Sequence, residues 1–319
     1  MVSTIRFNAR GVTLTGIFSP PMSETSRPLL ICLHGGSYTS HYFNYRSQGS
    51  DTLIQLAPLL GFPVLALDRP GYAAGSERVM AFDAQAEILA EAATDARRQF
   101  APASSGVFLV GHSIGAMIAM LMAAYHRPDA LVGIDLSGAG LTYRTEGLAA
   151  LSAFVAMTDP PRQADPVRRR GRMFGPPGTY DENVVAEDLA WAPLAQPAEI
   201  GEALAWQDRV HAVAADVECP VRCVVADTDA LWEAGPRFEA AARAAFARSP
   251  LIDIATQHNA GHCLHLHHIA RAANLRTLAF AAEIEAIGIL TTGLTLKIGE
   301  SGGRDGNPGQ SAKRHSMIP

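Results

Sequence analysis

The sequence predicts an α/β protein with a mostly parallel sheet that helices cover on both faces. Its short apolar runs are too continuous for strands with one solvent-exposed face, and they alternate with stretches of helical length and periodicity. Such alternation is typical of a parallel sheet between two helical layers, although a TIM barrel shares it. The expected strands are Leu29–Leu33, Val64–Leu67, Val107–Val110, Leu131–Leu136, Val221–Ala226 and Leu251–Ala255.

An N-terminal hairpin adds two strands, so the expected sheet has eight. Ser3–Ala9 and Val12–Phe18 alternate apolar and polar residues on either side of Arg10-Gly11, which is typical of a β-hairpin. The expected helices are Asp51–Leu60, Asp83–Phe100, Ile114–Tyr125, Glu233–Ala247 and Leu266–Ile287.

The alternation stops over residues 139–216, and this interval predicts a helical cap. The interval is rich in proline, contains helix-forming pieces and is too long for a plain loop. We therefore expect an α/β core formed by residues 1–138 and 217–287, with the cap inserted after the sixth strand. Residues 288–319 are rich in glycine and polar residues, so we expect a disordered tail there.

The composition predicts an ordinary globular protein and argues against two kinds of partner. Hydrophobic residues make up 48% and charged residues 18% of the 319 positions, which excludes disordered, collagen-like and coiled-coil chains. A net charge of −5 argues against a nucleic-acid partner, which would call for a basic stripe. The chain has neither an 18-residue apolar run nor a secretion signal, so we expect no membrane association and a cytoplasmic location. The expected partner is a small-molecule substrate, and both a monomer and a homodimer remain open.

The cysteines and histidines predict no metal site and no cofactor. Cys219 and Cys223 are separated by three residues, and Cys32 and Cys263 do not complete a zinc site with them. Reduced thiols are therefore expected. Five histidines cluster within residues 258–268, but no carboxylate stands at ligand spacing beside them.

The strongest functional motif is the G-x-S-x-G sequence at residues 111–115. It follows an apolar strand and precedes a helix of small residues, which is the context of a nucleophilic serine. The flanking glycines avoid clashes in a sharp turn that exposes the Ser113 hydroxyl above the sheet. The helix that begins at Ile114 directs its free N–H groups and its positive end to the same point.

A serine nucleophile needs a base, and the expected base is His262. This histidine follows Gly261 on the loop after the last expected strand, where its imidazole can reach Ser113. His258 and His265 are the alternatives.

The base in turn needs an orienting acid, and Asp229 is favoured because it lies further into the loop after the seventh strand. Asp227 is the alternative, although its place nearer the strand suits a carboxylate that ties the loop by backbone hydrogen bonds. Asp135 is a more remote candidate, because its place inside an apolar run indicates a buried structural role.

Two backbone N–H groups are expected to stabilise the oxyanion, one from Ile114 and one from the loop after the third strand. The loop carries His34-Gly35-Gly36-Ser37, and its glycines let the backbone approach a substrate carbonyl. Gly36 is the expected second donor and Ser37 the alternative. Loss of one such donor lowers the rate by about 100- to 1,000-fold.

Together these motifs resemble the α/β-hydrolase superfamily, specifically its capped group. The resemblance covers residues 1 to about 287, and the order serine, aspartate, histidine is the one expected of that family. It implies the α/β-hydrolase fold, with cap residues lining the substrate pocket. The segments that carry the resemblance are His34–Ser37, Asp68-Arg69-Pro70-Gly71-Tyr72, Gly111–Gly115 and Gly261-His262.

The resemblance implies hydrolysis through an acyl-enzyme on Ser113. Related haloalkane dehalogenases and epoxide hydrolases carry an aspartate at this position, so a serine favours a carboxylic ester, thioester or lactone of a small to medium apolar substrate. Carbon–carbon bond cleavage of a diketone acid and acyl transfer are alternatives with the same residues, and a non-catalytic ligand-binding role is an alternative of another class. The arginine run 168–172 is expected to form a solvated face, with contact to an anionic substrate as the alternative.

Overall fold

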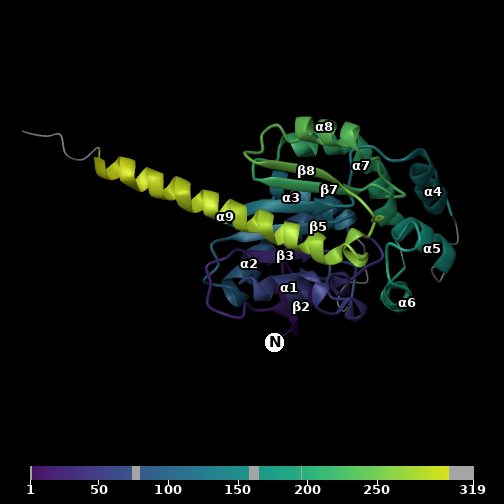
Figure 1. Ribbon diagram of the computed structural model, residues 1–319, viewed down its shortest axis with the longest axis horizontal. Coiled ribbons are helices and arrows are strands. Elements are labelled where there is room, and N and C mark those ends of the chain that lie inside the picture. The colour runs from purple at the N-terminus through teal and green to yellow at the C-terminus, as the bar shows by residue number, and fades with distance from the viewer. Residues whose placement is uncertain (1, 74–79, 158–164, 195, 302–319) are drawn as a thin grey trace, which may run out of the picture.

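The predicted strands join into one open sheet in the computed structural model (Figure 1). The structure describes residues 2–73, 80–157, 165–194 and 196–301. The strand order is β1-β2-β4-β3-β5-β6-β7-β8, with antiparallel pairing of β2 to β1 and to β4 and parallel pairing elsewhere. This open sheet excludes the TIM barrel and confirms the predicted α/β-hydrolase fold. The strands are β1 (Ser3–Ala9), β2 (Val12–Ser19), β3 (Leu29–Leu33), β4 (Val64–Leu67), β5 (Val107–His112), β6 (Leu131–Ser137), β7 (Val221–Ala226) and β8 (Ile252–Gln257).

Helices cover both faces of the sheet (Figure 1). They bury the side chains that alternate between its two faces. Helices α2 (Phe82–Phe100), α3 (Ile114–Tyr125) and α8 (Pro236–Ala245) pack on one face, and α1 (Leu53–Leu59) and α9 (Ala270–Ser301) pack on the other. The side chains of β3 alternate between the two cores. Leu29, Ile31 and Leu33 pack in the core beneath α2, α3 and α8. Leu30 and Cys32 pack in the core on the other face, beneath α1 and α9. Both faces of each central strand are therefore dry, which explains the continuous apolar runs. The described part of the chain also contains three short 3₁₀ helices, which are η1 (Ser40–Phe43), η2 (Arg46–Asp51) and η3 (Leu264–Leu266).

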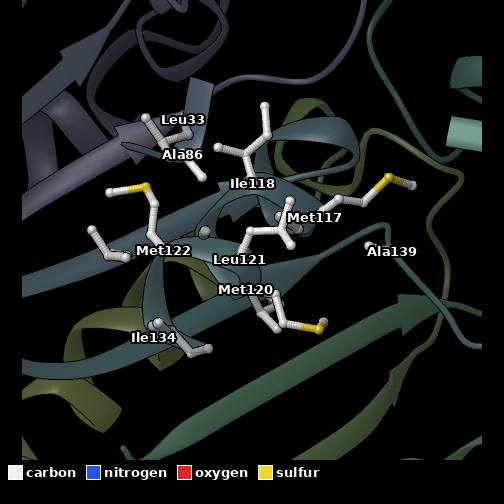
Figure 2. Packing of buried hydrophobic residues seen from close by; sticks show 14 of the residues in the cluster. Leu33, Ala86, Met117, Ile118, Met120, Leu121, Met122, Ile134 and Ala139 are labelled. Carbon is white, nitrogen blue, oxygen red and sulfur yellow. The ribbon is translucent and has the colours of Figure 1, made fainter. Parts of the chain in front are cut away.

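Helix α3 lies at the centre of the larger core. Its side chains are buried around the whole helix from Ile114 to Ala123, so it is apolar on every side rather than amphipathic. Figure 2 shows Met117, Ile118 and Met120 pointing in different directions around this helix. Because core side chains pack closely around α3, its first residue and the adjoining end of β5 are held in a defined place.

Among the described residues, four helices connect β6 to β7, within the interval predicted as a cap. We call residues 139–216 the cap from here on; the division into core and cap stays a prediction. Prolines at the first turns of α5 and α7 suit helix starts, because proline has no N–H and a helical φ. The cap helices are α4 (Thr145–Val155), α5 (Pro166–Met173), α6 (Glu182–Trp191) and α7 (Pro197–Ala215).

Helix α9 corrects the prediction of a disordered tail from residue 288 onward. The helix crosses one face of the sheet and continues past it to Ser301 (Figure 1). Residues 289–298 still contain apolar residues, whereas the glycine-rich composition behind the prediction belongs to residues 299–311. Residues 302–319 of the predicted tail lie outside the described residues. Although α9 is long, none of the described helices is apolar enough over a sufficient length to cross a membrane.

Two glycines in different surroundings predict opposite effects of substitution by alanine: Gly115, where α3 crosses β3, and Gly201 on α7. A Cβ at Gly115 would lie 2.1 Å from the carbonyl oxygen of Leu33, which is backbone and cannot move aside. We expect Gly115→Ala to lower the free energy of unfolding by about 3 kcal/mol, as overpacking does. Gly201, inside α7, has no neighbouring atom within 4 Å of such a Cβ. We expect Gly201→Ala to raise the free energy by about 0.5–1 kcal/mol. Urea unfolding followed by circular dichroism measures both, and equal effects at the two sites would contradict this packing account.

Candidate active site

The turn between β5 and α3 holds Ser113 in a strained backbone conformation. Ser113 has φ 54° and ψ −121°, a region that costs a non-glycine residue about 1–3 kcal/mol. Its N–H donates to the carbonyl of Ser137 on β6 over 2.7 Å, which fixes the turn against the neighbouring strand. The flanking glycines permit close packing, since a Cβ at Gly111 would lie 2.5 Å from Cα of Ala116. The turn therefore has the geometry that the G-x-S-x-G motif predicts.

The structure brings Ser113, His262 and Asp229 together in one hydrogen-bonded chain. Nε2 of His262 lies 2.9 Å from Oγ of Ser113, and Nδ1 of His262 lies 2.9 Å from Oδ2 of Asp229. An ionised carboxylate can only accept a hydrogen bond, so Nδ1 of His262 carries a proton and donates a hydrogen bond to Asp229. The lone pair of Nε2 is then free to accept the Ser113 hydroxyl proton. Both His262 and Asp229 are buried, at 2% and 1% exposure, which protects the pair from water.

Backbone amides fix the second oxygen of Asp229. Its Oδ1 accepts from the N–H groups of Leu231 at 2.8 Å and Trp232 at 3.2 Å. These two bonds hold the carboxylate plane in place toward His262 and compensate the burial of its charge.

The alternative acids and one alternative base are occupied elsewhere. Oδ2 of Asp227 lies 3.0 Å from Nδ1 of His258, whose side chain is exposed. The same oxygen also accepts a hydrogen bond from the N–H of Asn259. Asp135 accepts from Arg222 over 2.8 Å in the sheet interior. None of these groups contacts Ser113 in the described part of the chain.

Two other histidines of the rich segment, His265 and His267, are buried structural groups. Nδ1 of His265 lies 2.9 Å from the Asn274 side-chain oxygen, and Nε2 of His267 accepts from the Gly261 N–H at 3.0 Å. Burial lowers the pKa of His265 and of His267 to about 4, so both are neutral at pH 7. Among the described residues, no three histidine, cysteine, aspartate or glutamate side chains gather as a metal site.

Gly36 and Ile114 lie side by side next to the serine. A Cβ built on Gly36 would approach the Ile114 side chain to 2.9 Å, so the Gly36 backbone packs directly against that side chain. Ile114 is the first residue of α3 and its N–H has no acceptor within the helix. The N–H of Ser37, the alternative donor, is instead directed to the Tyr72 hydroxyl at 3.3 Å. This occupation favours Gly36 over Ser37 as the second donor.

A buried ion pair supports the loop that carries Gly36, and the sequence analysis missed half of it. Arg69 donates to the carbonyls of His34 and Gly35 at 2.8 and 3.2 Å and pairs with Glu199 of α7 at 2.5 Å. Burial disfavours the guanidinium, but Glu199 and Tyr72 together raise the pKa of Arg69 above its ordinary value. Tyr72 also donates to Glu199. No local motif marks Glu199, so only the folded structure could identify it.

Two adjacent cavities open at the site. The smaller, of about 50 Å³, is lined by Ser113, His262, Gly36 and Ile114 together with apolar side chains from the core and cap. The larger, of about 740 Å³, lies among α4, α5 and the segment after α6. They meet at shared lining residues, which are Ser37, Arg172, Met173 and Leu231.

The fold and the site thus define an α/β-hydrolase with a serine in the sharp turn between β5 and α3. The sequence matches the model of the alpha/beta hydrolase family over residues 30–275, which is well over half of the chain. The chain belongs to this family and is a hydrolase. No curated protein sequence matches it.

Solved structures of enzymes with different activities share the fold. An esterase from Thermogutta terrifontis has a TM-score of 0.62 at 15% identity, over 88% of this chain and 99% of that chain. An E-2-(acetamidomethylene)succinate hydrolase has a TM-score of 0.63 at 19% identity, over 89% and 100%. A loop variant of a haloalkane dehalogenase from Bradyrhizobium elkanii has a TM-score of 0.62 at 18% identity, over 91% and 100%. At such identities the likeness shows the fold alone.

The Arg69–Glu199 pair predicts a large loss of stability when Glu199 is removed. Both side chains are fully buried, so Glu199→Ala leaves the guanidinium without its carboxylate. We expect the free energy of unfolding to fall by about 3–5 kcal/mol. The matched control is Arg209→Ala, which breaks the Asp83–Arg209 pair between α2 and α7 at 39–49% exposure. We expect that loss to be about 1 kcal/mol or less. Guanidinium denaturation measures both, and a small effect of Glu199→Ala would show that the buried pair is not needed for stability.

Proposed function

We propose that this hydrolase cleaves a carboxylic ester, thioester or lactone through an acyl-enzyme on Ser113. The observation that carries the proposal is the chain of two 2.9 Å contacts from Asp229 through His262 to a serine held in a strained turn. A serine hydroxyl is a weak nucleophile unless a positioned base accepts its proton, and this arrangement supplies that base.

In the proposed first step, Oγ of Ser113 attacks the substrate carbonyl while Nε2 of His262 accepts its proton. Asp229 stabilises the imidazolium that forms and keeps Nδ1 protonated. The N–H groups of Gly36 and Ile114 donate to the oxyanion. His262 then donates its proton to the departing alcohol or thiol, and the acyl group remains on Ser113.

In the proposed second step, water replaces the leaving group. The water oxygen attacks the acyl carbonyl while Nε2 of His262 accepts a proton from the water. The bond between Ser113 and the acyl group then breaks, and the proton returns to Oγ of Ser113. The product is a carboxylic acid. Carbon–carbon cleavage of a diketone acid and acyl transfer would use the same residues, so a substrate panel rather than a variant separates them. Binding without turnover would favour the non-catalytic alternative.

Replacement of Ser113 by alanine tests the nucleophile. We expect hydrolysis of p-nitrophenyl butyrate to fall by at least about 10³-fold, since no acyl-enzyme can form. Initial rates measured at 405 nm give the result, and an unchanged melting temperature controls for folding. An alanine variant that keeps most of its activity would overturn the proposal.

Two isosteric substitutions on one loop test the acid. Asp229→Asn keeps the shape of the side chain but favours the wrong imidazole tautomer, and we expect kcat to fall by about 10³- to 10⁴-fold. Asp227→Asn is the matched control, because Asp227 contacts the exposed His258 instead. We expect that control to retain nearly the full kcat. A larger loss of kcat for Asp227→Asn would assign the acid to Asp227. Equal losses for the two variants would contradict the assignment of Asp229 as the acid.

A further inference from the structure

The arginine run on α5 divides into paired and unpaired members. Three of its arginines contact a carboxylate within the cap, and Arg169 is buried against the Tyr38 ring as well. These three satisfy their charge without any ligand. The pairs are Arg168 with Asp165 at 3.5 Å, Arg169 with Asp188 at 2.5 Å and Arg170 with Glu182 at 2.7 Å.

Arg172 differs from the other three because no carboxylate or carbonyl in the described part of the chain accepts from it. The side chain is half-buried, so solvent does not fully compensate its charge. Burial and the repulsion from Arg168 and Arg169 lower the pKa of Arg172, although a guanidinium still stays protonated at neutral pH. A half-buried cation without an acceptor is unfavourable for the free protein and favourable for binding an anion.

Arg172 also stands where the two cavities meet. It lines the small cavity together with Ser113 and His262, and it lines the larger cavity next to Met173. In the small cavity the other described lining side chains are apolar, aromatic or hydroxyl-bearing, apart from His262 itself. A molecule whose carbonyl contacts Ser113 can therefore place a second group against Arg172 within the same space.

The acidic residues near the larger cavity do not neutralise Arg172. Asp165 caps α5 through the N–H groups of Val167 and Arg168 and pairs with the Arg168 guanidinium. Glu146 lies exposed in the first turn of α4. Neither contacts Arg172, so among the described residues that line the cavities no carboxylate compensates this positive charge.

We propose that Arg172 binds a carboxylate of the substrate, so that the hydrolase acts on small esters or thioesters that carry a free carboxylate beside the scissile bond. The inference rests on the proposed function, and it specifies the substrate class of the same site. A guanidinium suits this task because its parallel N–H groups match both oxygens of a carboxylate. The contact would orient the substrate along the axis from Arg172 to Ser113.

Two matched substrate pairs test the inference by activity. p-Nitrophenyl hemiglutarate against p-nitrophenyl hexanoate places the charge on the acyl side, and 4-acetoxybenzoate against 4-methylphenyl acetate places it on the alcohol side. We expect one pair to show a higher kcat/KM for the anionic member. Arg172→Met should lower that preference by about 10- to 100-fold, the range of a charge-assisted hydrogen bond. Hydrolysis of the neutral members should persist.

Arg170→Met is the matched control, because it removes the same charge from the same helix at an exposed residue that lines neither cavity. It should leave the preference unchanged. Thermal melting separates binding from structure: Arg172→Met should keep or raise the melting temperature, since it removes a half-buried charge that two neighbours repel. A structural arginine would instead lower it when replaced.

Calorimetric binding of glutarate and of 4-hydroxybenzoate decides the inference without any turnover. We expect at least one of them to bind, about 10-fold or more weaker in Arg172→Met and equally well in Arg170→Met. Binding that does not depend on Arg172, or no binding of either acid to the unmodified protein, overturns the inference. If neutral esters are still hydrolysed through Ser113 in that case, the proposed function stands alone. If Arg172-dependent binding is seen without Ser113-dependent hydrolysis, the proposed function fails instead.

Discussion

The left-handed backbone at Ser113 is the constraint on which the rest of the site depends. A residue with φ 54° and a side chain persists only where its surroundings hold it, and here β5 and helix α3, which is buried from Ile114 to Ala123, do so. The amide of Ser113 is bonded to Ser137, and the close approach at Gly115 leaves no space for the turn to relax. Because β7 and β8 end at the same edge of the parallel sheet, the loops that carry Asp229 and His262 converge on this one point.

The cap is tied to the core through buried charges rather than through apolar packing alone. Glu199 of α7 pairs with Arg69, which in turn holds the carbonyls of the loop before Gly36. On α5, Arg169 pairs with Asp188 and lies within 3.5 Å of the Ser37 carbonyl. A displacement of either cap helix would therefore be transmitted to the loop that faces Ser113. Buried pairs of this kind contribute little net stability, but they fix geometry, and each partner is costly to lose.

The sequence predicted what local patterns carry and missed what depends on distant contacts. Dry strands, the G-x-S-x-G turn and the Gly-His loop each have a short signature. The strands could therefore be located from the sequence, and the position of His262 within reach of Ser113 could be predicted. Asp227 and Asp229 share one loop, and only the tertiary distance to the imidazole separates them. Glu199 lies 130 residues from Arg69 and belongs to no motif. The arginine run was expected as one solvated face, yet its members have different environments because α5 packs against the core on one side only. The length of α9 was underestimated because glycine content was weighed over the whole tail.

Covalent labelling tests the central claim, an activated serine in a strained turn, most directly. The protein would be treated with a fluorophosphonate probe, and the modified peptide would be mapped by mass spectrometry. The account predicts a single adduct on Oγ of Ser113 that is lost in His262→Ala and retained in His258→Ala, because Nε2 of His262 lies 2.9 Å from that oxygen, whereas His258 pairs with Asp227. An adduct on another residue, or none on the folded protein, would contradict the claim.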